Sequence, residues 1–285
     1  MSELTEAEAV RDITTSGGWA RVIGPGTVYT RPDNNGAITV FDTDEYSDYP
    51  RRKRATRIMT SSSSFASYLA EHGDKKTEVF ADAKGNTIIG IIDSHGGHGL
   101  DGGWQSHKVT LVLEHTKSWN HWTLNDGKWF DQIEFAEFIE QHSTDITEPD
   151  SAELMSIAQN FYMTKGLEYE STQRLDNGET KLVYKEKVAT KGLGTIEVPK
   201  QLTLALQPYI GSPRQYCHAG FRTRLHGSTL QIGYVLIRPE EILDGIFEDI
   251  VTELAEGREA VAATDKKPAV DSFGPVAAPI YFGRP

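Results

Sequence analysis

A glycine-rich stretch, residues 93–107, gathers side chains of the types that hold metal ions in proteins. Imidazole and carboxylate groups ligate zinc, manganese and ferrous iron, and glycines let a short loop fold back until several side chains converge. Asp93 would orient one ligand through a hydrogen bond without touching the ion. The predicted ligands of a divalent transition metal are His95, His98, Asp101 and His107.

The spacing of these ligands matches none of the familiar metalloenzyme patterns. The chain contains no His-Glu-x-x-His, no His-x-Glu and no cysteine pair. In the alternative interpretation, the glycines supply positive φ angles and the histidines make ordinary hydrogen bonds. The incomplete pattern favours this second interpretation, so neither a catalytic residue nor a cofactor is predicted.

Tryptophan is concentrated in the middle of the chain. Indole rings bury large areas in a core or a subunit interface, and they also stack on nucleic acid bases. Core or interface is the favoured use. Because Trp119 and Trp122 are three residues apart, a helix would place them on one side of a turn. The predicted interface or binding residues are Trp104, Trp119, Trp122 and Trp129, and they make a homo-oligomer the expected state.

A basic run stands out in an otherwise acidic chain. It consists of Arg51, Arg52, Lys53, Arg54 and Arg57. Such a run can bind phosphate, and single-stranded DNA is the matching partner. The alternative is a solvated strand paired with the acidic segment 42–48. Arg222 and Arg224, two apart on a predicted strand, would project to one side and add to a basic patch.

Other reactive residues give no support for covalent catalysis. Glu134, Glu137 and Glu140 step by three along a predicted helix, which makes a solvated acidic ribbon and not two carboxyls facing across a cleft. The single cysteine, Cys217, excludes an intramolecular disulfide, and its neighbour His218 does not form a catalytic dyad by adjacency alone.

The elements that must position these residues are mainly hairpins and amphipathic helices. Turn signals separate strand-like segments at 33–36, 82–86, 176–178 and 226–228. The segment 87–92 is apolar on both faces, so we expect it at the centre of a sheet. Helices are predicted after Ser61, Asp131, Asp150 and Pro239, where capping residues precede an apolar period of three and four. The predicted class is α+β, with mainly antiparallel sheets built from hairpins and packed by a few amphipathic helices.

Three regions are expected along the chain. Residues 1–50 form an N-terminal helix and hairpin, and residues 51–257 form the main α+β domain. Helices within 131–163 either divide this domain into two subdomains or interrupt one continuous sheet. Residues 258–285 are predicted to be a mobile tail, with Ile280–Phe282 as an alternative docking segment.

Charge and hydropathy bound the function. The chain of 285 residues has 29 Lys+Arg and 41 Asp+Glu, a net charge of −12. This charge excludes a protein that holds duplex DNA by nonspecific attraction alone, so any nucleic acid contact must be local. No apolar run approaches the ~20 residues of a membrane span, and the N-terminus lacks a signal-peptide pattern. We therefore expect a cytoplasmic protein with no membrane partner.

Residues in the centre of the chain carry a resemblance to a known family. They are His115-Thr116, Trp119-x-x-Trp122, Gly127 and Gln132-x-x-Phe135-Ala136-x-Phe138-Ile139-Glu140, with Val198-Pro199 and Arg222-x-Arg224 in addition. Over roughly residues 60–256 the chain resembles the YfdQ-like family of uncharacterised bacteriophage and prophage proteins. The resemblance implies a phage origin and the cytoplasm of an infected host. It supplies no activity and no catalytic residue.

The sequence thus predicts a non-enzymatic bacteriophage accessory protein that acts by binding and self-association, with a host or phage protein as a further partner. Two alternatives stay open. One is a metal-dependent enzyme that uses the 93–107 loop. The other is a replication or recombination accessory protein that contacts single-stranded DNA through the basic run.

Overall fold

The computed structural model describes residues 28–32, 38–42, 53–96, 101–163, 169–176, 179–185, 193–226, 229–260 and 271–285. The chain divides into two compact units, residues 1–55 and 56–285. In the first unit, β1 (Val28–Pro32) pairs antiparallel with β2 (Ile38–Asp42), which is the hairpin expected around residues 33–36. The helix predicted ahead of it lies outside the described residues.

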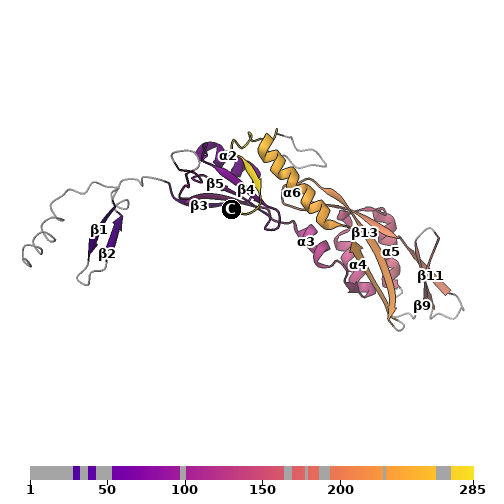
Figure 1. The fold of residues 1–285 in the computed structure, drawn as a ribbon. Coiled ribbons are helices and arrows are strands. Elements are labelled where there is room, and N and C mark those ends of the chain that lie inside the picture. Colours follow the sequence, from indigo (N-terminus) through magenta and orange to yellow (C-terminus); the bar gives the residue numbers. More distant parts are fainter. Residues whose placement is uncertain are drawn as a thin grey trace, which may run out of the picture. The chain divides into compact units, whose positions relative to one another are not determined.

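The first of two five-stranded sheets in the second unit has the order β15-β4-β5-β6-β3 (Figure 1). Its strands are β15 (Ile280–Phe282), β4 (Glu78–Asp82), β5 (Thr87–Ile91), β6 (His107–Val112) and β3 (Ala55–Met59). The β4-β5 and β5-β6 pairs are antiparallel, and β15 runs parallel to β4. As predicted for its two-sided apolar sequence, β5 is the central strand.

Helices α2 (Ser62–His72) and α6 (Pro239–Glu256) share one hydrophobic core with this sheet. Alternate strand residues point into that core, including Val79, Ile88 and Leu111. Gly90 lets α2 approach closely, because a Cβ atom there would lie 2.9 Å from a methyl group of Leu69. The first sheet is therefore covered on one face.

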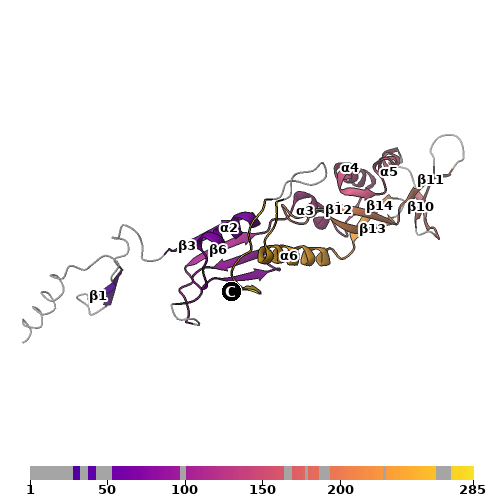
Figure 2. The ribbon, with the colours of Figure 1, turned by 90° about the horizontal axis from the view of Figure 1, so that it is seen from above.

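The second five-stranded sheet has the order β7-β14-β13-β12-β8, and all of its pairs are antiparallel. Its strands are β7 (Trp129–Phe130), β14 (Thr229–Leu236), β13 (Gln215–His226), β12 (Gln201–Leu206) and β8 (Ile146–Glu148). Helices α4 (Gln132–Gln141) and α5 (Ser151–Met163) lie on one side of it (Figure 2). A separate three-stranded sheet has the order β11-β10-β9.

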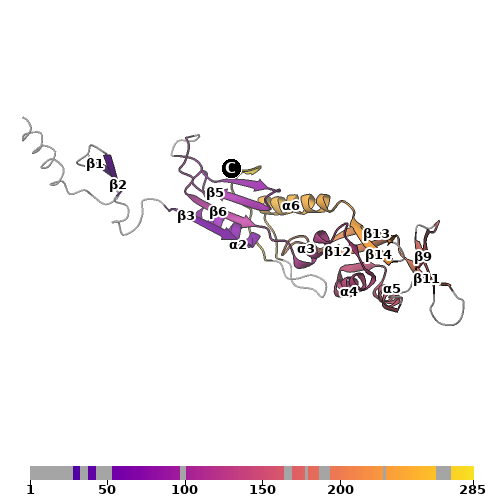
Figure 3. The ribbon, with the colours of Figure 1, turned by 90° about the horizontal axis from the view of Figure 1, so that it is seen from below.

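This three-stranded sheet is antiparallel and contains the hairpin expected at 176–178. Its strands are β9 (Tyr169–Arg174), β10 (Thr180–Lys185) and β11 (Leu193–Val198). Leu182 of β10 is fully buried and belongs to the same hydrophobic core as α4 and the second sheet. Helix α3 (Lys117–Leu124) also contributes to that core (Figure 3).

Local signals in the sequence explain where the helices start. Ser61 caps α2 by accepting the Ser64 N–H. Asp131 and Glu134 form the predicted capping box at the start of α4. The Asp131 side chain accepts the Glu134 backbone N–H, and the Glu134 side chain accepts the Asp131 backbone N–H. Asp150 accepts the Glu153 N–H ahead of α5, and Pro239 occupies the first turn of α6.

A hydrogen-bonded cluster joins the two sheet regions. The Tyr209 hydroxyl donates to Asn86 Oδ1 at 2.7 Å, and the Asn86 amide nitrogen lies 3.3 Å from His115 Nε2. The His115 ring stacks on Tyr209 at 4.8 Å, and its Nδ1 lies 3.1 Å from the Pro208 carbonyl oxygen. Burial, aided by Asp244, raises the pKa of Tyr209 to about 12, so the phenol stays a neutral donor.

Residues 271–285, which the sequence predicted to be part of a mobile tail, form a docked segment. Phe273 and Val276 are buried in the first core, and β15 completes the first sheet beside β4. The Arg258 guanidinium lies 4.8 Å over the Phe273 ring. The alternative docking segment Ile280–Phe282 therefore describes this part of the chain. Its anchors are too sparse to produce a periodic sequence signal.

The observed class is α+β with mainly antiparallel sheets, as the hairpin pattern predicts. Within the described ranges, none of the helices combines the length and the apolar character needed to cross a membrane.

Candidate functional site

A polar cluster at the start of the 93–107 loop is centred on Glu78 of β4. Its carboxylate accepts the Ser94 hydroxyl at 2.5 Å, and it lies 3.1 Å from His95 Nε2. The hydrogen bond from Ser94, with further help from His95, holds the pKa of Glu78 below its ordinary value. The structure thus pairs His95 with a fixed carboxylate that lies 17 residues earlier in the chain.

Asp93 closes the base of the same loop. Its carboxylate accepts the backbone N–H groups of Ser106 and His107 at 3.0 and 2.9 Å, and the Ser106 hydroxyl at 2.8 Å. Burial acts to raise the pKa of Asp93, but these hydrogen bonds outweigh it and the pKa lies below its ordinary value. Glycine is required at position 103, where the two ends of the loop pass close to each other, because a Cβ atom there would lie 2.0 Å from the Asp93 carbonyl oxygen.

The structure describes two of the other three predicted metal ligands, His107 and Asp101. His107 is buried and its Nε2 lies 2.8 Å from the Tyr68 hydroxyl on α2, whereas Asp101 is exposed. His98 lies outside the described residues. In the parts of the chain that the structure describes, no three His, Cys, Asp or Glu side chains gather closely enough to hold a metal ion.

The four predicted binding tryptophans have three different environments. Trp119 and Trp122 on α3 are buried in the second core, where the Trp122 ring packs against Phe138 and Tyr234 at 5.0 and 4.9 Å. Trp129 is half-buried, and Trp104 is 76% exposed. The structure therefore uses two of the four rings for packing and does not join all four in one surface.

A buried carboxylate that sequence reasoning missed supports α3. Asp145 accepts the Ser118 hydroxyl at 2.5 Å and the Trp122 Nε1–H at 3.2 Å, and it lies 3.5 Å from His142 Nδ1. Burial acts to raise the pKa of Asp145, but the bonds from His142, Ser118 and Trp122 outweigh it and the pKa is lowered. Because Ser118 donates directly to the carboxylate, this group of residues fixes packing and does not form a Ser-His-Asp relay.

Cys217 is likewise structural. It is buried on the core side of β13, and burial, with the nearby Asp126 charge, raises the pKa of its thiol to about 11. The thiol therefore stays protonated and unreactive near neutral pH.

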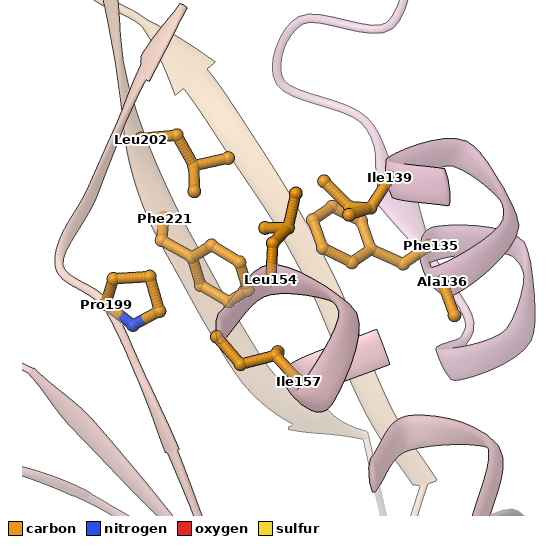
Figure 4. Close-up of a pocket in the computed structure, with 8 residues that line it drawn as sticks. All are labelled: Phe135, Ala136, Ile139, Leu154, Ile157, Pro199, Leu202 and Phe221. Carbon is orange, nitrogen blue, oxygen red and sulfur yellow. The ribbon is translucent and has the colours of Figure 1, made fainter. Parts of the chain in front are cut away.

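A small pocket lies between α4, α5 and the second sheet (Figure 4). Its lining is formed by Phe135, Ala136, Ile139, Leu154, Ile157, Pro199, Leu202 and Phe221. A ligand site normally adds a few polar groups that orient the ligand. All eight lining residues are apolar, so the space has the character of a packing gap.

The predicted basic run leads into an edge strand. Arg51 and Arg52 lie outside the described residues, Lys53 and Arg54 are exposed just before β3, and Arg57 is exposed on β3 itself. The run therefore adjoins the first sheet.

A different basic surface lies on the second sheet. Arg222 and Arg224 project to the same side of β13, as their spacing predicts, and the Arg224 guanidinium lies 4.2 Å over the Trp129 ring. We define the basic–aromatic face as Tyr216, His218, Arg222, Arg224 and His226 of β13, with Trp129 of β7. The two-residue spacing of the β13 members of this face can be read from the sequence. The position of Trp129 beside them depends on the pairing of β7 with β14, which the sequence does not show.

Comparison with known families places the chain. The model of a family described as an uncharacterized conserved protein (DUF2303) matches residues 22–265. The chain belongs to this family. The DUF2303 match includes the Glu78 cluster, the Asp145 group and the basic–aromatic face, whereas β15 lies beyond it. Neither a curated protein nor a solved structure matches the chain.

Proposed function

We propose that this DUF2303 protein is a non-enzymatic bacteriophage accessory protein that acts by binding and self-association in the cytoplasm of the infected host. The phage origin and the host compartment rest on the resemblance to YfdQ-like proteins. The binding role rests on one observation: β3 lies at the edge of the first sheet, with β6 as its sole neighbour among the described strands.

Strand β3 contributes no fully buried residue to the core. Thr56, Arg57 and Ile58 are consecutive and all exposed, and the Ile58 side chain is 72% exposed. Among the described strands, only β6 lies beside β3 in the sheet. An edge of this kind presents unpaired N–H and C=O groups to another strand, and β-branched Thr56 and Ile58 suit such pairing.

A second copy of β3 is the partner that fits this edge. Antiparallel pairing of identical strands creates a twofold interface in which each copy offers the same surface. A register centred on Ile58 brings the two copies of Ile58 together and places Arg57 opposite Met59, so that like charges do not face each other. Self-association then removes an exposed isoleucine from water.

Light scattering on the full chain at micromolar concentration tests this proposal. We expect a dimer or larger oligomer, and we expect Ile58→Lys to shift it toward monomer. The matched control is Leu124→Lys on α3, which changes an equally apolar residue that is 67% exposed. A wild-type protein that is only monomeric, or an oligomer that Ile58→Lys leaves intact, would contradict self-association through β3.

A further inference from the structure

We propose that the basic–aromatic face of the second sheet binds single-stranded nucleic acid. This inference goes beyond self-association, and it places the contact on a surface other than the basic run at residues 51–57.

The face lies on the side of the sheet that points away from helices α4 and α5 (Figure 2). Along β13, Cys217 and Ala219 are buried, whereas the alternate residues Tyr216 and His218 are exposed. The pattern continues to the end of the strand, where Arg222, Arg224 and His226 are exposed in the same row. From Tyr216 to His226 this row extends about 33 Å, at 3.3 Å for each residue. Such a length accommodates several nucleotides, within the 4–16 nucleotides that single-strand-binding folds typically cover.

Charge on this face is complementary to phosphate. The chain as a whole carries −12, so the two neighbouring arginines stand out locally. Within the described ranges, neither Arg222 nor Arg224 forms an ion pair with a carboxylate, and Arg224 Nε donates instead to the neutral Gln231 amide at 2.7 Å. Their positive charge is therefore not neutralised. Glu148 lies on the β8 side of the sheet, where it accepts the Thr203 hydroxyl.

Aromatic rings interleave with these cations. The central carbon of the Arg224 guanidinium lies 4.2 Å from the centre of the Trp129 ring, and Tyr216 is 70% exposed near the other end of the row. Guanidinium planes and aromatic rings on an open antiparallel sheet are the groups on which unpaired bases stack. Between them, Gly220 has no side chain, and a Cβ atom there would meet only the Val235 carbonyl oxygen, at 3.8 Å. A strand of nucleic acid can therefore approach the sheet closely at this point.

Duplex DNA suits this face poorly. Stacking on Tyr216, or on the Arg224 guanidinium that lies over Trp129, needs bases whose faces are free, and these faces are hidden in a double helix. The two arginines alone would give weak, sequence-independent contact with a duplex backbone, against the overall negative charge of the chain. The combination of few cations with exposed rings favours a single strand.

Fluorescence anisotropy with labelled oligonucleotides of about 20 nucleotides tests the proposal. The probes are oligo-dT, oligo-rU and a duplex of the same length, measured from about 50 to 200 mM salt. We expect both single strands to bind more tightly than the duplex. The double variant Arg222→Gln/Arg224→Gln should weaken binding at least tenfold. It should also reduce the slope of log K against log salt by about 1.4, the loss of two phosphate contacts.

The matched control is Lys75→Gln/Lys84→Gln, which removes two exposed cations from the first-sheet region and should leave binding unchanged. Tyr216→Ala should weaken binding roughly tenfold or more, whereas Tyr216→Phe should retain it because the ring that stacks is kept. Trp104→Ala, at an exposed ring in the loop between β5 and β6, should have no effect.

Circular dichroism and melting curves that match the wild type establish that each variant is folded. Absence of binding to either single strand at low salt would overturn the proposal. So would a preference for the duplex, or binding that the two β13 arginines do not affect. A larger loss from Lys75→Gln/Lys84→Gln than from the β13 pair would move the contact to the first-sheet region and equally overturn the proposal.

Discussion

The two five-stranded sheets are built alike but expose different parts of themselves. Each is mainly antiparallel and buries one face under helices. Among the described strands, the first sheet pairs β3 only with β6, and its polar clusters lie at Glu78 on β4 and at Asp93 in the loop after β5. The second sheet leaves a face open at β13 and places a carboxylate, Asp145, inside its core. An edge suits pairing with another strand, whereas a face suits a flat or stacked ligand, and this difference is why we propose separate uses for the two regions.

The largest expected effect separates buried tryptophan from exposed tryptophan. Trp122→Ala should reduce the free energy of unfolding by about 3–5 kcal/mol, because it leaves a cavity beside Phe138 and Tyr234 and removes a donor to Asp145. Trp104→Ala should change it by less than about 0.5 kcal/mol. Urea denaturation measures both. Equal losses would break the distinction between core and surface rings.

Hydrogen exchange on the same Trp122→Ala protein sharpens the comparison of the two sheets. If the Asn86, His115 and Tyr209 cluster makes the regions unfold together, exchange should accelerate in β5 and β6 as well as in β13 and β14. Faster exchange confined to β13 and β14 would instead show that the sheets open separately.

The first region should depend on its docked C-terminal segment. Phe273→Ala should cost about 3 kcal/mol, because it empties a buried site and removes the ring beneath Arg258. Phe282→Ala, in the same segment but exposed, serves as the control and should cost much less. Thermal or urea unfolding measures the difference. A Phe273→Ala protein as stable as the wild type would mean that the segment adds nothing to the first core.

Asp145→Asn should cost about 1–3 kcal/mol at neutral pH, since the amide group cannot accept all the bonds that the carboxylate accepts. The folded-state pKa of Asp145 lies below the ordinary value of 3.8, so the unfolded chain binds the proton more readily. This contribution is complete above that ordinary value and is lost as the pH falls through the folded-state pKa. Urea midpoints at neutral and acidic pH should therefore converge for wild type and Asp145→Asn. Glu137→Gln, on the exposed side of α4, should show no such convergence.

The smallest expected effect is at the surface of the first sheet. Arg284 Nε lies 2.6 Å from Asp82 Oδ2, which joins the end of the docked segment to β4. Because the arginine is exposed, Arg284→Ala should cost about 0.2–1 kcal/mol, and the cost should shrink as salt is added. A loss of several kcal/mol that salt does not change would show that this pair holds the segment in place.

The sequence predicted the elements whose signals are local. The capping box at Asp131 and Glu134 requires residues three apart, and each hairpin requires a turn signal between two alternating segments. Both kinds of signal are complete within a few residues, which is why α4, α6 and the paired strands were placed correctly. The shared direction of Arg222 and Arg224 followed from the two-residue period of a strand.

Contacts between distant residues could not be predicted in this way. The pairing of His95 with Glu78 depends on how the loop returns to β4, and the burial of Asp145 depends on three elements meeting. The metal-site prediction treated residues 93–107 as a single convergent loop. The structure instead directs His107 toward Tyr68 on a helix. A local sequence pattern does not predict which distant residue a histidine side chain will contact.

Strand β15 has a consequence for how the first sheet is made. Its partner β4 is synthesised about 200 residues earlier, and at about 5–20 residues per second the ribosome needs on the order of 10–40 seconds to reach β15. During that interval the edge of β4 that β15 later pairs with has no strand beside it. A chaperone or another nascent chain therefore has time to bind this edge before β15 is synthesised.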